Sequence, residues 1–594
     1  MTGQLEKLIK QLLHEVKLGK NVDNKLLLSL QKRYLKNTAS SNSFFSKSEI
    51  LQACWQLPAA TTLSEQQKAK LRSLLQLKPV RSWSGVTVVT VLTKPWPCPG
   101  RCLFCPADVR MPKSYLANEP GAARAEANYF DPYLQVYSRL ETLQAMGHNL
   151  EKIELIILGG SWDSYPLPYR LWFVKQLFTA LNKFATPLGK QQFTRLHHFY
   201  KQLHFANESF ISNNSEKNLA TFASFQKKIN AGVLSYNQFV QRCYLGSQRE
   251  VFLAKKQRAN WQQVFHAHTL NQDAKIRNVG LVIETRPDLI SESTLLCNRR
   301  LGCTKIQMGV QTLSDKLLSL NQRDTRVAQI AQAFWLLRQF GFKIHVHMMA
   351  NLLGANVASD LAAYRMLVTD ERFIPDEIKL YPCALLESAP GLMACYQAGT
   401  WQPYTSEQLL YLLGECIKIT PRHIRITRMI RDFSAHDIVA GNKKTNFRQA
   451  VEQQLQQQQI PVKEIRSREI KRQVISLKQL QLTDTSYCTQ NGKEHFLEYH
   501  TADEHIVGFL RLSLPQGGSD AMIREVHVYG EAQKLGSPGE SQHLGLGKKL
   551  IAQSERMAKK HGYVRLRVIS AVGTRGYYRE RGFSDGELYQ EKVL

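Results

Sequence analysis

The middle of the chain alternates between β-forming and helical segments. Segments with helical periodicity, such as 132–146 and 327–340, separate six runs rich in β-branched and aromatic residues. The six runs cover residues 86–93, 153–158, 279–284, 304–309, 343–348 and 377–381. Strands that alternate with helices predict a parallel sheet with crossover helices, and such sheets bind ligands at the carboxyl ends of their strands. We therefore expect an α/β fold whose six units form an open or partial (β/α)6 barrel.

A loop directly after the first predicted strand carries three of the eleven cysteines. Cys98, Cys102 and Cys105 lie in "TKPWPCPGRCLFCP" with the spacing C-x3-C-x2-C, and most of the others are scattered. An odd, scattered set is not a disulfide framework, whereas clustered thiolates suit iron–sulfur clusters and zinc. A structural zinc site needs four protein ligands, and no fourth Cys or His lies nearby in the sequence. The spacing therefore favours a four-iron–four-sulfur cluster with one open iron, with a zinc-binding loop as the alternative.

A glycine motif near the C-terminus indicates a second binding site. The segment "QHLGLG", residues 542–547, fits Q-x-x-G-x-G and precedes an amphipathic helix predicted over 546–560. Glycines let the backbone approach a ligand closely, and free amides at a helix start can bind a pyrophosphate. With predicted strands over 496–500, 506–514, 523–529 and 564–568, this helix forms a second α/β domain over 475–594. A plain turn is the alternative.

The net charge of the chain is +29, with a pI near 9.6. Charge of this size favours a polyanionic partner, and we expect nucleic acid, with a generally basic enzyme as the alternative. Residues 1–80 are predicted as a basic helical region that binds tRNA, and 401–474 as a helical connector. An insertion at about 189–268 interleaves aromatic and basic residues, compatible either with stacking on bases or with an ordinary helical insertion. With no run of eighteen apolar residues, we expect a cytoplasmic protein without a membrane partner.

These motifs together resemble known families. The cysteine loop after the first strand is similar to the signature of radical S-adenosylmethionine enzymes, and the C-terminal motif resembles the acetyl-coenzyme A site of GNAT acetyltransferases. The whole chain resembles the family of the catalytic subunit of Elongator, which modifies the wobble uridine of tRNA. The resemblance rests on the following segments, in this order: "EPGAARAEANYFDPYLQVYSRLETLQAMGHNLEKIELIILGG", "LVIETRPD", "IQMGVQ", "IKLYP", "IREVHVYG" and "VGTRGYYRERGF".

The resemblance implies a fold, a reaction and its cofactors. The fold is a partial radical S-adenosylmethionine barrel over 81–400 joined to a GNAT domain. An open iron of the cluster would bind S-adenosylmethionine, whose cleavage gives a 5′-deoxyadenosyl radical. That radical would take a hydrogen atom from the acetyl methyl of acetyl-coenzyme A, and the carbon radical would add to carbon 5 of the wobble uridine in the tRNA anticodon stem-loop. Oxidation of this adduct and hydrolysis of the thioester would leave a carboxymethyl group, and a need for accessory subunits stays open.

The resemblance also implies site residues. The contacts of S-adenosylmethionine would be Gly159 and Gly160 of "LGGSW", together with Glu284, Gln311 and Lys379. The contacts of acetyl-coenzyme A would be Glu525, Val526, His527 and Val528 along the pantetheine arm, and Gln542, Gly545, Leu546, Gly547 and Lys548 at the pyrophosphate. Tyr577 or Tyr578 would lie near the thioester as a catalytic group. Lys152, also a candidate catalytic group, and Lys94 would contact acetyl-coenzyme A or substrate near the barrel mouth.

The chain departs from the family at four places. The connector reads "PVKEIRSREI" without cysteine, so we predict no zinc site there. Ala440 stands where the family often has histidine, and Ala571 replaces a common glycine. The insertion at 189–268 is longer than in the relatives.

Three rival functions stay open at this point. A protein lysine acetyltransferase with Glu525 as general base would leave the three cysteines without a role. A tRNA-binding protein with a structural cluster would transfer nothing. A radical enzyme acting on a small molecule would leave the net charge without a purpose.

Overall fold

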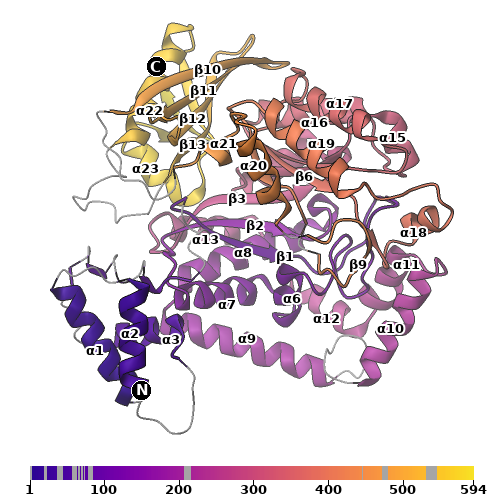
Figure 1. The fold of residues 1–594 in the computed structure, drawn as a ribbon, viewed down its shortest axis with the longest axis horizontal. Coiled ribbons are helices and arrows are strands. Elements are labelled where there is room, and N and C mark those ends of the chain that lie inside the picture. Colours follow the sequence, from indigo (N-terminus) through magenta and orange to yellow (C-terminus); the bar gives the residue numbers. More distant parts are fainter. Residues whose placement is uncertain are drawn as a thin grey trace.

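The computed structural model describes most of the chain (Figure 1). The described residues are 3–18, 23–35, 44–56, 63–64, 67–68, 71, 74–77, 84–206, 216–431, 433–444, 446–470, 479–529 and 545–594. None of the helices in these ranges is long and apolar enough to span a bilayer.

A seven-stranded parallel sheet forms the centre of the molecule. Its strands, in spatial order, are β1 (Thr87–Leu92), β2 (Lys152–Leu158), β3 (Arg277–Thr285), β4 (Lys305–Gln311), β5 (Lys343–Ala350), β6 (Glu377–Pro382) and β8 (Arg425–Arg428). Every neighbouring pair is parallel, so the carboxyl ends of all seven strands meet at one edge. The open α/β half-barrel confirms the predicted fold class and all six predicted strands. The seventh strand, β8, lies in the segment expected to be a helical connector.

Crossover helices cover the outer face of this sheet. They are α6 (Pro120–Ala127), α7 (Pro132–Ala145), α8 (Leu167–Lys183), α14 (Glu292–Arg300), α15 (Asp315–Leu320), α16 (Val327–Gln339), α17 (Val357–Thr369), α18 (Pro390–Gln397) and α19 (Ser406–Ile419). Local sequence starts them: Pro132 opens α7 after Asp131, whose side chain accepts from the Leu134 amide. Apolar faces of most of these helices share one core with the strands, whereas Ala122 and Ala125 of α6 and Leu392 of α18 belong to two smaller cores at the loop after β1.

The helical insertion lies between β2 and β3. It comprises α9 (Pro187–Ala206), α10 (Glu216–Asn230), α11 (Tyr236–Phe239), the π-helix η3 (Val240–Leu245), α12 (Gln248–Lys256) and α13 (Trp261–Gln272). Its aromatic side chains on α9 point inward, because the Tyr200 ring stacks on Tyr129 and the Phe193 ring on Tyr137. Lys190 on the same helix is exposed. For these aromatic residues the packing favours an ordinary helical insertion over a base-stacking surface.

The C-terminal part forms a second seven-stranded sheet. Its spatial order is β10 (Gln481–Thr489), β11 (Gly492–His500), β12 (Ile506–Pro515), β13 (Asp520–Val528), β14 (Arg565–Val568), β16 (Gln590–Val593) and β15 (Ser584–Asp585). The helix α22 (Leu546–Lys560) packs on β12 and β13, as predicted from the amphipathic pattern. The sequence did not predict β10, β15 or β16. Most of β10 is exposed or half-buried, so it lacks the apolar pattern that marks a strand.

Buried ion pairs join the second sheet to the first. Asp376, directly before β6, is fully buried and accepts from both terminal nitrogens of Arg524 on β13, at 2.8 and 2.7 Å. Arg511 on β12 lies 3.3 Å from the same carboxylate. Lys343 at the start of β5 pairs with Glu525 of β13 at 2.5 Å. The second sheet therefore docks on the edge where the strands of the half-barrel begin, and Figure 1 shows it there.

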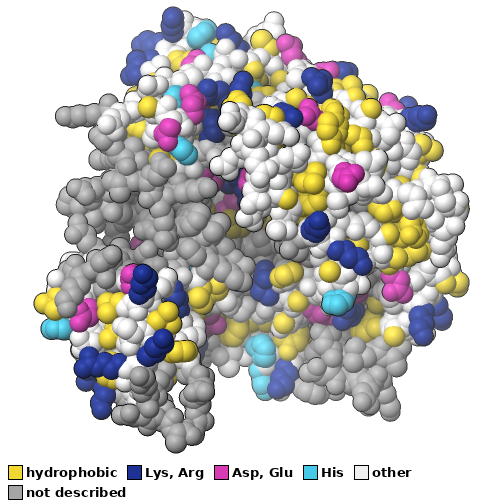
Figure 2. Space-filling view, in the orientation of Figure 1, with side chains coloured by type: hydrophobic (Ala, Val, Ile, Leu, Met, Phe, Trp, Pro, Cys, Tyr) yellow, Lys and Arg dark blue, Asp and Glu magenta, His cyan; other side chains and the backbone are white. Residues whose placement is uncertain are grey.

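The N-terminal helices pack around a small core of their own. They are α1 (Gly3–Lys17), α2 (Asn24–Leu35) and α3 (Lys47–Gln56). Leu8, Ile9, Leu12, Leu13 and Val16 are buried, as the helical spacing predicts, and Leu5 is partly buried. Lysine and arginine side chains lie on the outside of this unit in Figure 2. A role for this unit in binding tRNA stays a prediction.

Candidate functional site

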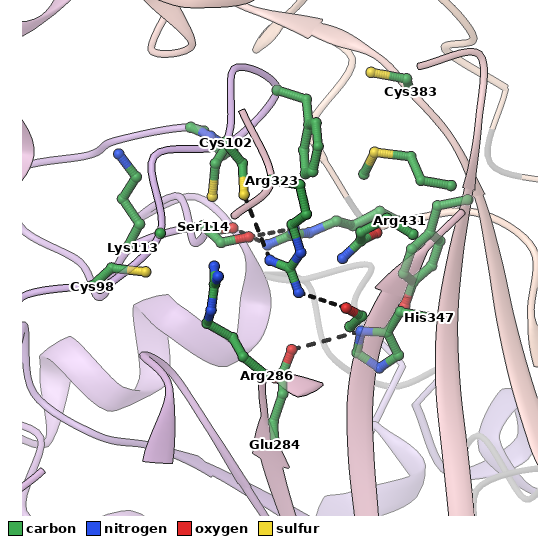
Figure 3. Close-up of a pocket in the computed structure, with 18 of the residues that line it drawn as sticks. Cys98, Cys102, Lys113, Ser114, Glu284, Arg286, Arg323, His347, Cys383 and Arg431 are labelled. Carbon is green, nitrogen blue, oxygen red and sulfur yellow. Dashed lines mark hydrogen bonds and ion pairs between the residues drawn. The ribbon is translucent and has the colours of Figure 1, made fainter. Parts of the chain in front are cut away.

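A cavity opens at the carboxyl edge of the half-barrel, and we call it the cysteine cavity. Cys98, Cys102 and Cys105 line it from the loop after β1. Glu284 near the end of β3 and Gln311 at the end of β4 line it from the sheet (Figure 3). The structure therefore brings these five predicted site residues together, at the edge where ligands of parallel sheets gather.

The three thiols are free. Among the described residues, no group of three or more His, Cys, Asp and Glu side chains could hold a single metal ion. Thiolates around one zinc ion lie about 4 Å apart, since each Zn–S bond is about 2.3 Å. Cysteines of an iron–sulfur cluster each bind a different iron, so their sulfurs stand further apart. Three thiols from one loop that line one cavity fit the three corners of a cluster. Burial raises the pKa of Cys105 to about 11.

Two guanidinium groups point into the same cavity. Arg323 Nη1 lies 3.5 Å from Cys102 Sγ, and Nη2 of the same side chain donates to the Gly309 carbonyl. Arg323 Nε and Arg286 Nη2 are buried, and neither finds a partner within the described part of the chain. Buried cationic donors without acceptors are costly, so a group that carries negative charge or lone pairs would satisfy them. Cluster sulfurs and a carboxylate are both such groups.

Gly159 and Gly160 follow β2 and line the cavity. Gly159 has a φ of +127°, and a Cβ there would overlap Thr93 Oγ1 at the end of the neighbouring strand. A Cβ on Gly160 would lie 2.9 Å from Tyr165 Oη. The positive φ of Gly159 explains why a glycine stands there. At Gly160 the missing side chain leaves the main chain accessible from the cavity.

A second cavity lies between the two sheets, at the opposite edge of the half-barrel, and we call it the interface cavity. Glu525, Val526 and His527 of β13 line it together with Tyr578. From the half-barrel it is lined by strand-start residues, namely Glu154, Lys305, Lys343, Glu377 and Arg425. The predicted pantetheine-facing strand and one of the two predicted tyrosines thus share a cavity with charged residues that the sequence reading did not select.

The start of α22 carries the rest of the predicted acetyl-coenzyme A motif. Gly545 has a φ of +74° directly before the helix, a conformation that favours glycine. A Cβ on Gly547 would lie 2.6 Å from Tyr577 Oη and 3.9 Å from a methyl of Val528, so Tyr577 covers this turn. Leu546 is buried and Lys548 is exposed. Gln542 lies outside the described residues.

A chain of polar side chains crosses the interior of the half-barrel between the two cavities. At the interface end, Glu377 lies 2.8 Å from Lys343 and 3.2 Å from Lys305. His345 Nδ1 lies 3.3 Å from Glu377, and the rings of His345 and His347 are 5.8 Å apart. At the other end, His347 Nδ1 lies 3.6 Å from Glu284 in the cysteine cavity. We call this chain the polar lumen.

The lumen holds its groups in unusual protonation states. Burial lowers the pKa of His345 and of His347 well below the ordinary value, so both imidazoles are neutral. Burial also lowers the pKa of Lys379 to about 8, although Glu284 acts in the opposite direction. Lys379 donates to Gln307 Oε1 at 2.7 Å, and His347 Nε2 lies 3.3 Å from that oxygen. Lys379 therefore belongs to the wall between the cavities.

Two predicted site residues lie elsewhere. Lys94 is 5% exposed, and its ammonium contacts Glu250 at 2.9 Å and Gln257 at 2.7 Å, so it does not reach either cavity. Lys152 begins β2, which puts it at the interface edge and not beside the cysteines. Burial and the neighbouring Arg277 lower the pKa of Lys152. In this structure Lys94 is paired within the chain, and its role as a substrate contact stays a prediction.

The sequence held a signal for the lumen residues. In β4, β5 and β6 polar residues stand at every second position: Lys305 and Gln307; Lys343, His345 and His347; Glu377, Lys379 and Tyr381. Side chains two apart in a strand share a face, so this pattern marks one polar face on three adjacent strands. Arg286 and Arg323 reach the cysteine cavity from outside the strands, and no such pattern marks them in the sequence.

Comparison with known proteins gives matches over the whole chain. The family pattern of the Radical_SAM C-terminal domain matches residues 375–457. The chain is 33% identical to the tRNA uridine(34) acetyltransferase of Dehalococcoides mccartyi, over 85% of this chain and 96% of that protein. It is 27% identical to human Elongator complex protein 3, over 89% of this chain and 88% of that protein.

A solved structure has the same fold. The archaeal Methanocaldococcus infernus Elp3, with residues 1–46 deleted, superimposes with a TM-score of 0.64 at 26% identity. The match covers 86% of this chain and 99% of that one.

Proposed function

Because the chain belongs to the family of the tRNA uridine(34) acetyltransferases and Elongator complex protein 3, we propose that it modifies the wobble uridine of tRNA. We propose further that it uses S-adenosylmethionine and acetyl-coenzyme A to attach a carboxymethyl group to carbon 5 of that base. One observation carries the finer proposal: two cavities stand at opposite edges of one half-barrel, and the polar lumen joins them.

The cysteine cavity is the proposed site of the cluster and of S-adenosylmethionine. Cys98, Cys102 and Cys105 would hold three corners of a four-iron–four-sulfur cluster. Such a cluster, when bound, supplies the electron that cleaves S-adenosylmethionine to a carbon radical. Arg286 and Arg323 would donate to the sulfurs or to the carboxylate of S-adenosylmethionine, which satisfies their buried nitrogens.

The interface cavity is the proposed site of the acetyl end of acetyl-coenzyme A. Backbone groups of Val526 and Val528 would face the pantetheine arm, and the start of α22 would hold the pyrophosphate. Lys343 and His347 are four residues apart on β5, which spans about 13 Å in an extended strand. The acetyl group would therefore have to enter the lumen, where neutral imidazoles and fixed amides exclude bulk water and hold it near its reaction partner.

The basic N-terminal helical unit, α1 to α3, is the proposed contact of tRNA. The charge of +29 favours a polyanion, and an anticodon loop offers unstacked bases that can enter a cavity.

The electrostatics of Glu525 disfavour the alternative function, a protein lysine acetyltransferase that uses this residue as its general base. A general base should have a pKa near the working pH. Burial alone would raise the pKa of Glu525, but Lys343 and Arg511 overcome this and hold it below the ordinary value. Glu525 is therefore a structural anion between two cations and a weak base.

The test follows acetyl-coenzyme A labelled on its methyl carbon. Anaerobically reconstituted protein is incubated with the labelled compound, bulk tRNA, S-adenosylmethionine and dithionite, and the tRNA nucleosides are then weighed. We expect a labelled uridine with the wild type and with Cys488→Ala, an exposed thiol far from the cavity, and none with Cys102→Ala. Label on protein lysines independent of S-adenosylmethionine, with none in tRNA, would instead support the acetyltransferase.

A further inference from the structure

The cysteine loop has no regular structure of its own. Between the end of β1 at Leu92 and the start of α6 at Pro120 the chain forms only turns and bends. Main-chain groups in such a loop are not paired in a ladder. Some pair with other main-chain groups, as the Leu103 amide does with the Asn321 carbonyl, and others depend on side chains or water. Several of these side chains come from the helical insertion, which is more than one hundred residues away in the sequence.

The side chain of Asn237 in α11 forms hydrogen bonds with both main-chain groups of Cys98. Its Oδ1 accepts from the Cys98 amide at 2.9 Å, and its Nδ2 donates to the Cys98 carbonyl at 2.8 Å. A side-chain amide that pairs with both main-chain groups of one residue acts like a neighbouring strand. It fixes the orientation of that residue, and with it the direction of the Cys98 side chain.

The insertion repeats this contact further along the loop. Gln226 of α10 accepts from the Val109 amide at 3.0 Å and donates to the Ala107 carbonyl at 2.9 Å. Tyr236 Oη donates to the Met111 carbonyl at 2.8 Å. Ala107 and Val109 also share a small hydrophobic core with the insertion. The loop and the insertion therefore pack as one unit.

The insertion also contacts the loop at its start. Lys94 pairs with Glu250, which is 2% exposed, and donates to Gln257, both on or next to α12. A buried pair of this kind is strongly destabilised when one partner is removed. The role of Lys94 is thus to fasten the loop before the first cysteine.

We propose that the helical insertion is a clamp for the cysteine loop, and that Asn237 is a positioning residue that sets the place of Cys98 among the three cluster ligands. The inference rests on the proposed role of the cysteines. A cluster bridges fixed distances, so a ligand whose backbone can move binds it less firmly. Loss of both hydrogen bonds of Asn237 should speed cluster loss about tenfold.

The test compares three variants of the reconstituted full-length protein. Asn237→Ala removes both hydrogen bonds, and Asn237→Asp keeps the acceptor for the Cys98 amide. The matched control is Asn260→Ala, which removes an asparagine that caps α13 in the same insertion without touching the loop. Iron per chain, the rate of iron release to a chelator, and the electron paramagnetic resonance spectrum of the reduced protein with and without S-adenosylmethionine are measured. In cluster-free protein, hydrogen exchange of the Cys98 amide is followed.

We expect Asn237→Ala to release iron about tenfold faster than wild type, to change the spectrum, and to exchange the Cys98 amide faster, with Asn237→Asp intermediate. We expect Asn260→Ala to match the wild type. A wild-type release rate and spectrum in Asn237→Ala would overturn the proposal, as would an equal effect in Asn260→Ala. If Asn237→Ala does not fold, Asn237→Asp decides by the same measures. Wild-type protein that binds no iron would instead refute the proposed function, and none of these readouts needs tRNA or acetyl-coenzyme A.

Discussion

Asp376 is the residue whose loss should most weaken the docking of the two sheets. Its carboxylate is fully buried and accepts a two-pronged pair from Arg524, together with the Ile344 amide at 2.8 Å. Arg511 contributes a second cation at 3.3 Å. Although burial acts against the charge, the arginines hold the pKa of Asp376 far below its ordinary value, so the group is an anion.

The magnitude follows from what the change leaves behind. Removal of one partner from a buried ion pair costs about 3–5 kcal/mol, because an unpaired charge stays buried. Arg524 would keep Glu494 and Arg511 would keep Glu525, each at 3.0 Å, so we expect the lower end, about 3 kcal/mol. For a domain the size of the C-terminal one, residues 481–594, this loss corresponds to a fall of roughly 10 °C in the transition temperature.

The assay is differential scanning calorimetry of Asp376→Asn, which keeps the shape and removes the charge. Asp585→Asn is the control, because Asp585 pairs with Arg579 on the surface, where a salt bridge contributes about 1 kcal/mol or less. The affinity for acetyl-coenzyme A should fall together with the transition temperature, since residues of both sheets line the interface cavity. Equal transition temperatures in the two variants would refute the reasoning.

Three further predictions concern single sites. Gly547→Val should weaken binding of acetyl-coenzyme A in calorimetric titration and leave S-adenosylmethionine binding unchanged, because the new side chain would meet the Tyr577 hydroxyl. Loss of the Lys379 proton at about pH 8 removes a positive charge that acts on Glu284 of the cysteine cavity, so binding of S-adenosylmethionine to the reconstituted protein should weaken as pH rises through this value, and Lys379→Arg should move this loss to higher pH. Burial raises the pKa of Asp360 from 3.8 to about 6, so the folded state binds more protons between these values and stability falls as pH rises across that window. Asp360→Asn should therefore lose this part of the pH dependence in urea unfolding measured from pH 3.5 to 7, and a profile parallel to wild type would contradict it.

The sequence predicted those parts of the fold and site that repeat or cluster. Six buried strands and α22 were predictable because apolar periodicity extends over several turns or residues of each. The cysteine cavity was predictable because its three cysteines stand in one loop after a strand. The short β8 and the polar β10 carry too little pattern, and they form because neighbouring strands supply partners. The contacts of Lys94 were not predictable, since Glu250 lies 156 residues away in sequence.

The opposite placement of the two cavities has a kinetic consequence. When both substrates reach an active site through a single entrance, one must leave before the other binds, or the two must bind in a fixed order. With the two co-substrates at the proposed sites, each would enter through its own cavity, so either could bind first and neither would block the other. We therefore expect initial-rate plots against acetyl-coenzyme A and S-adenosylmethionine to intersect, as for a random sequential mechanism, and spent coenzyme to depart while the modified base is still held.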